Sequence, residues 1–98
     1  MLSYTRVKRF ARALRITIVD KLSSSTLSGV LHIEQGAVRV EVNPNISDED
    51  KAVTILNALN VLLPGHGDRA VRAELGEGML FCRFPDTPGC VLGVLRAA

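Results

Sequence analysis

The stretch that decides the fold is VNPNISDEDKAVTILNALNVLL, residues 42–63. It begins as the end of a strand, turns at a proline, and continues as a long amphipathic helix over residues 47–63. Ser47 is a good N-cap, Asp50 stands three residues on as in a capping box, and the first turn is acidic, as the helix dipole favours. Pro64-Gly65 ends the helix. Its core-facing stripe consists of Ala52, Ile55, Leu56, Leu59, Leu62 and Leu63.

Upstream of this stretch the sequence predicts one helix and three strands. The helix covers residues 3–14, and its apolar stripe contains Tyr4, Val7, Phe10, Ala11 and Leu14. The β-branched run 16–19 predicts a first strand, followed by a polar loop over 23–26. Residues 29–34 and 37–42 predict two more strands, joined by a tight turn at Gln35-Gly36. In the second of them valines alternate with Arg39 and Glu41, which predicts one buried and one solvent-facing side.

Downstream of Pro64 the pattern has a period of two. After a loop at 65–68, residues 70–75 and 79–84 predict strands that flank a hairpin turn at 76–78. A second turn is expected at 86–89 and a last strand at 90–95. The expected fold class is therefore α+β: a mostly antiparallel sheet of five or six strands with an N-terminal helix and one central amphipathic helix. No repeat or linker divides the chain, so residues 1–98 should form a single domain.

The composition is apolar for so short a chain. Of its 98 residues 47% are hydrophobic, and the mean hydropathy is +0.22. Either the core is large for its size or a partner covers apolar surface, and a homodimer is the natural solution. No apolar run approaches a membrane span, and no apolar segment follows the basic N-terminus as in a signal peptide. Together with only two cysteines, this predicts a cytoplasmic protein with free thiols and no membrane partner.

The order of these elements resembles the zinc metallopeptidases of the ImmA/IrrE family. Residues 10–18 resemble the family's helix-to-strand opening, although Arg15 stands where the family often has glycine. Residues 28–31 and 38–45 resemble two of its strands, the second ending in Val-Asn-Pro. Residues 47–63 resemble the segment that leads into and carries its HExxH helix. The resemblance covers residues 10–63, and the tail from Gly65 onward does not match.

The metal-binding residues of that helix are missing from this chain. Thr54 is kept, but Val53 replaces the usual phenylalanine. Asn57 stands in place of the first histidine ligand and Val61 in place of the second, while Ala58 replaces the glutamate that acts as general base. Two histidines at i and i+4 hold zinc on one helix face, and the glutamate takes a proton from the bound water. The departures predict an inactive relative with no catalytic residues, no metal and no cofactor.

Two sets of residues are candidates for binding a partner. Asn57, Asn60 and Val61 would line the former active-site groove and grip a peptide, or the two asparagines are a solvated pair on the helix flank. The second set is a basic cluster without any acid in the first fifteen residues, which would contact phosphates or an acidic partner, or is a solvated helix face. It consists of Arg6, Lys8, Arg9, Arg12 and Arg15.

A metal site elsewhere in the chain is not expected. The spacings of His32, His66, Cys82 and Cys90 fit no known zinc pattern, so we interpret them as two surface histidines and two buried thiols. The leading hypothesis is a non-catalytic protein-binding or regulatory module. The family resemblance implies a transcriptional regulator of a bacterium or phage as its partner. The alternatives are a small nucleic-acid-binding protein, a metalloenzyme with an unrecognised site, and a structural homo-oligomeric subunit.

Overall fold

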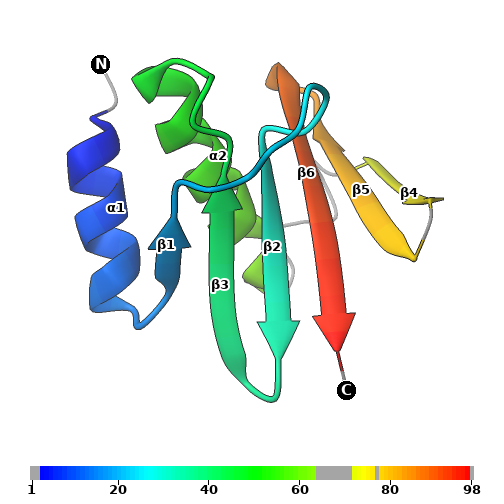
Figure 1. Cartoon of the computed structure of the whole chain (residues 1–98), viewed down its shortest axis with the longest axis horizontal. Coiled ribbons are helices and arrows are strands. Elements are labelled where there is room, and N and C mark those ends of the chain that lie inside the picture. Colours follow the sequence, from blue (N-terminus) through cyan, green and yellow to red (C-terminus); the bar gives the residue numbers. More distant parts are fainter. Residues whose placement is uncertain (1–2, 64–71, 77, 98) are drawn as a thin grey trace.

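The computed structural model describes residues 3–63, 72–76 and 78–97. Two helices and six strands follow one another along the described part of the chain (Figure 1). They are α1 (Tyr4–Ala13), β1 (Thr17–Val19), β2 (Gly29–Glu34), β3 (Ala37–Val42), α2 (Asp48–Leu62), β4 (Arg72–Gly76), β5 (Met79–Phe84) and β6 (Thr87–Ala97). The fold is α+β, as the sequence predicts. The predicted loop at 65–68 lies outside the described residues.

The sheet has six strands in the order β1-β3-β2-β6-β5-β4. The pairs β2–β3, β5–β6 and β4–β5 are antiparallel, whereas β1–β3 and β2–β6 are parallel. The expected mostly antiparallel sheet is therefore wrong in this detail, because the sheet is mixed. The parallel contacts join strands far apart in sequence, and no local turn signal in the sequence announces them.

Two turns can be compared with their prediction from short-range sequence signals. One of them is predicted correctly, and the other lies at a different position. Gln35 and Gly36 both have positive φ, 49° and 81°, which suits the two-residue turn between β2 and β3. The predicted turn at 86–89 is wrong: Phe84 pairs with Thr87, so Pro85-Asp86 forms the turn and β6 begins at Thr87. Both Pro85-Asp86 and Pro88-Gly89 suit a tight turn, because proline fixes φ at a value that turns require. The sequence alone therefore does not distinguish the two positions.

Both helices begin at serine caps. The Ser47 hydroxyl accepts a hydrogen bond from the Asp50 backbone amide (3.1 Å), which confirms the predicted start of α2. Ser3 does the same for Arg6 at the start of α1 (3.3 Å). Each cap satisfies one of the backbone donors that a helix N-terminus leaves without a partner. No helix of the described residues is long and apolar enough to cross a lipid bilayer.

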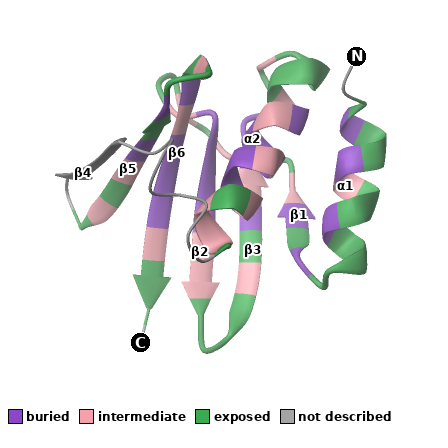
Figure 2. Cartoon of the chain, turned by 180° about the vertical axis from the view of Figure 1, so that it is seen from behind, coloured by how far each residue is buried: buried purple, intermediate pink, exposed green. Residues whose placement is uncertain are grey.

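The two helices lie on the same side of the sheet, and the core fills the space between the layers (Figure 2). α2 packs on β3 and β6, and α1 packs beside α2 and against β1. Fully buried side chains come from every part of this arrangement, among them Ala11, Leu31, Val42, Ile55 and Leu92.

A glycine sets how closely α2 approaches the sheet. A Cβ at Gly29 would lie 2.6 Å from Cγ2 of Thr54 and 2.9 Å from the backbone oxygen of Glu41. Both distances are below any normal contact, so only glycine lets the middle of α2 lie on β2.

The opposite face of the sheet is crossed by the loop between β1 and β2 (Figure 1). Asn43 holds this loop in place, since its side-chain amide donates to the backbone oxygens of Ser24 and Leu27, both at 3.0 Å. Its own carbonyl oxygen accepts from the Asn45 amide at 2.9 Å. The Asn-Pro-Asn sequence after β3 thus joins the serine-rich loop to the start of α2 through side-chain hydrogen bonds.

Candidate functional site

The helix expected to carry a former active site uses its polar residue inside the fold. Asn57 is only 8% exposed, and its amide donates a hydrogen bond to the Thr87 hydroxyl (3.0 Å) at the start of β6. Ala58 is fully buried, Val61 packs against the core, and Asn60 is exposed. Asn57 is therefore buried, Val61 is half-buried, and of the three only Asn60 is exposed.

A small pocket of about 270 Å³ lies beside the first turns of α2 rather than around Asn57 and Asn60. The hydroxyl of Ser28 and the thiol of Cys90 line it, with the carboxylates of Glu49 and Asp50 at its edge. Ser28 already donates to the Gly89 backbone oxygen (3.4 Å) and accepts from the Val91 amide (3.2 Å). Its hydroxyl therefore holds the end of the loop before β2 against β6. The residues of the pocket are Ser28, Ile46, Glu49, Asp50, Val53, Thr87, Gly89 and Cys90.

The two cysteines are free and buried, as the sequence predicts. Burial raises the pKa of the Cys82 thiol, which keeps it protonated and unreactive. Cys90 lies 3.9 Å from the Thr54 hydroxyl, whose stronger contact is a 2.7 Å hydrogen bond to the Asp50 backbone oxygen. Both thiols belong to the core between sheet and helices.

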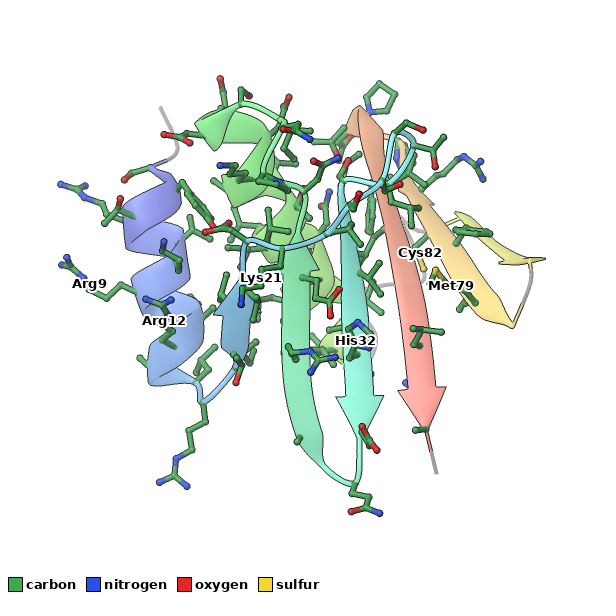
Figure 3. All side chains as sticks on the ribbon, viewed as in Figure 1. Arg9, Arg12, Lys21, His32, Met79 and Cys82 are labelled. Atoms are coloured by element: carbon green, nitrogen blue, oxygen red, sulfur yellow. The ribbon has the colours of Figure 1, made fainter. Side chains whose placement is uncertain are left out.

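His32 lies on the sheet face away from the helices, next to Glu41 and Arg39 of β3 (Figure 3). Its Nε2 is 3.2 Å from Oε1 of Glu41, which also contacts Arg39 at 3.3 Å. The Nε2 atom is shielded from solvent, and the contact lacks hydrogen-bond geometry. The sheet separates His32 from the two cysteines, and His66 lies outside the described residues. Within the described part of the chain, no three potential metal ligands come together.

The basic cluster is an exposed surface of α1. Arg6, Arg9, Arg12 and Arg15 are exposed, and Figure 3 shows Arg9 pointing away from the helix and from the rest of the fold. None of these four arginines forms an ion pair with another described residue. Lys8 instead lies over the Tyr4 ring, 4.6 Å from its centroid. Arg6, Lys8, Arg9 and Arg12 thus belong to α1, whereas Arg15 follows the helix, which ends at Ala13.

Two apolar residues share this surface, contrary to the predicted stripe. Phe10 is 57% exposed and Leu14 is 54% exposed, whereas Tyr4, Val7 and Ala11 are buried. The prediction that Phe10 and Leu14 face the core is wrong. A short helix at the edge of the sheet buries only a narrow side, and at about 100° per residue Phe10 lies a quarter turn away from its centre. The sequence of the helix contains no signal that distinguishes the exposed Phe10 from the buried apolar residues.

A second feature missed by the sequence reading is the outward side of α2. Leu63, placed in the core-facing stripe, is 50% exposed at the end of the helix, and Leu56 is half-buried. Glu49 and Asn60 are exposed on the same side. The helix is apolar on most of its circumference, so a stripe assigned from hydrophobicity alone did not reveal which side faces solvent.

Comparison with protein-family models, with curated proteins and with solved structures finds no match to this chain. The resemblance of residues 10–63 to the ImmA/IrrE family stays a prediction. The candidate site is therefore defined by its geometry alone: the outward surfaces of α1 and α2, which we call the helix-layer surface. It contains Arg6, Arg9, Phe10, Leu14, Asp48, Glu49, Val53, Leu56, Asn60 and Leu63.

Proposed function

We propose that this protein is a non-catalytic protein-binding module that recognises its partner through the helix-layer surface. The observation that carries the proposal is the exposure of Phe10 and Leu14 one helical turn apart, beside Arg6 and Arg9. Aromatic residues and arginine are the side chains most enriched at protein interfaces, where an apolar centre is surrounded by a charged rim. The chemistry of this surface fits an acidic, amphipathic helix as its partner.

The non-catalytic part of the proposal rests on the central helix. The side-chain amide of Asn57 donates its hydrogen bond to Thr87. Ala58 and Val61 have no group that binds a metal or transfers a proton. If the chain is a degenerate ImmA/IrrE-like domain, it recognises a regulatory protein without cleaving it. We infer a reducing compartment such as the cytoplasm, because both cysteines are free.

A peptide-binding measurement tests the proposal. The probe is a fluorescent helical peptide of leucine, glutamate and alanine with its leucines on one face. The control probe has the same composition in scrambled order. The protein should bind the ordered peptide more tightly, and Phe10→Ser with Leu14→Ser should weaken that binding about tenfold or more. Leu80→Ser, an exposed leucine on β5, is the matched control. Equal binding of both peptides, or no effect of the double substitution, would refute the proposal.

A nucleic-acid-binding protein is the second candidate, favoured by the arginines of α1 and by the exposed Phe10 among them. Phosphates would pair with the arginines and a base would stack on the ring. Affinity for a labelled DNA or RNA duplex or single strand should then fall steeply with salt, and Arg9→Ala with Arg12→Ala should reduce the salt dependence. Absence of binding at low salt would dismiss this candidate.

A further inference from the structure

The outward side of α2 has the spacing of a helix–helix contact. Glu49, Val53, Leu56, Asn60 and Leu63 follow one another at intervals of four, three, four and three residues. This alternation keeps one line of side chains on the same side of a helix, and it is the pattern by which helices pack along a shared seam. All five side chains are exposed or half-buried, so the seam is open to a neighbour.

The outward side of α1 carries the complementary arrangement. Arg6 and Arg9 are exposed ahead of Phe10 and Leu14 in the chain, and the exposed Arg12 and Arg15 lie in the last turn and just after the helix. α2 begins with exposed Asp48 and Glu49 and continues with its apolar residues. Each helix therefore has exposed charged residues ahead of its exposed apolar residues Phe10, Leu14 and Leu63, and the charges near the two helix starts have opposite signs.

The two helices also start at the same level of the molecule and run in the same direction (Figure 1). Nζ of Lys51, in the first turn of α2, lies 5.3 Å from the centroid of the ring of Tyr4, the first residue of α1. Arg6, Asp48 and Glu49 thus lie toward one end of the helix layer, and Phe10, Leu14 and Leu63 lie toward the other end.

We propose that the occupant of the helix-layer surface is a second copy of this chain, bound about a two-fold axis parallel to the helices. This proposal deepens the proposed function and rests on it. Such an axis places α1 of each copy over α2 of the other without reversing the helix direction. Arg6 and Arg9 then meet Asp48 and Glu49 of the other copy. Phe10 and Leu14 meet the apolar part of the α2 seam.

Self-association explains this distribution of charge better than an unrelated partner does. The surface holds both the arginines and the carboxylates that would match them. Of Arg6, Arg9, Asp48 and Glu49, only Asp48 forms an ion pair with another described residue, a 3.8 Å contact with Lys51. A two-fold contact uses every complementary pair twice. It also places the apolar helix faces between two sheets, where they leave water.

Light scattering of the whole chain and of charge-reversed variants tests the arrangement. The unmodified protein should be a dimer. Arg6→Glu with Arg9→Glu, and separately Asp48→Lys with Glu49→Lys, should each weaken dimerisation about tenfold or more, because like charges then face each other. An equimolar mixture of the two variants should dimerise again, since each α1 then meets an α2 of opposite sign. Phe10→Ser with Leu14→Ser should also dissociate the dimer.

Controls keep the test specific to this surface. Arg39→Glu reverses a charge on the opposite face of the sheet, and Leu80→Ser removes an exposed leucine from β5; neither should alter the dimer. Circular dichroism of each variant alone shows whether it is folded. The mixing experiment then uses only folded variants, so a failure to dimerise cannot come from unfolding. A monomeric chain, or variants that fail to pair when mixed, would overturn the dimer. Peptide binding that depends on Phe10 in a monomer would still support the proposed function.

Discussion

The side-chain amide of Asn57 in α2 donates a 3.0 Å hydrogen bond to the hydroxyl of Thr87, the first residue of β6. The bond joins the central helix to the longest described strand of the sheet at a partly buried position. It therefore assigns a structural role to Asn57.

Loss of this bond should destabilise the fold. Asn57→Ala is expected to lower the free energy of unfolding by about 1–2 kcal/mol, because the Thr87 hydroxyl loses its partner in a partly buried place. Combined with Thr87→Val, the second substitution should cost less than it does alone, with a coupling of about 0.5–1.5 kcal/mol. Urea unfolding of the four proteins measures this. Asn60→Ala, in the same helix but exposed, is the control, and additive effects would contradict the role given to Asn57.

Tyr4 should titrate far above its ordinary range. Its burial raises the pKa most, and the hydrogen bond to Asp20 and the negative charge of that carboxylate raise it further. As the only tyrosine of the chain it can be followed by its absorbance alone. Asp20→Asn should bring its pKa partly back toward the ordinary value. An unperturbed titration in the unmodified protein would contradict the buried, hydrogen-bonded position.

The same shift has a consequence for stability at alkaline pH. The pKa of Tyr4 is higher in the folded than in the unfolded chain. The contribution of Tyr4 to folding stability is therefore complete below the ordinary tyrosine pKa of about 10. Above that value the unfolded state loses its proton first, so stability falls as the pH rises. Chemical unfolding from neutral to strongly alkaline pH should show this decline, and Tyr4→Phe should make it shallower.

Gly29 should tolerate no side chain. In Gly29→Ala the new methyl group would meet Thr54 and the backbone oxygen of Glu41, and the backbone atom has no rotamer by which to move away. The free energy of unfolding should fall by about 1–3 kcal/mol. Gly89→Ala is the matched control, because nothing lies within 4 Å of a Cβ there. Equal melting temperatures of the two variants would contradict the close approach of α2 to β2.

The exposure of Phe10 separates it from its neighbours in α1. Val7→Ala should cost about 1–3 kcal/mol because it opens a cavity in the core. Phe10→Ala should change stability by only about 0.5 kcal/mol, as exposed substitutions do. Both values should be measured at protein concentrations too low for association. A large loss from Phe10→Ala under those conditions would place the ring in the core of the monomer after all.

The sequence by itself determined the local structure of this protein. The Ser47 cap, the acidic first turn and the apolar run that follows specified α2, and Gln35-Gly36 specified the turn between β2 and β3. Each of these signals acts within a few residues, through backbone hydrogen bonds and permitted φ values, so neighbouring side chains are enough to define it.

The tertiary structure alone decided the parallel pairing of β2 with β6, the inward position of Asn57 and the exposure of Phe10 and Leu14. These depend on contacts between segments far apart in the chain. An apolar residue in a short helix is buried only if another element covers that side of the helix. A side-chain amide points inward only if the interior supplies a hydrogen-bond partner, as Thr87 does for Asn57. Composition and periodicity describe the helix, but its neighbours determine which of its sides meets water.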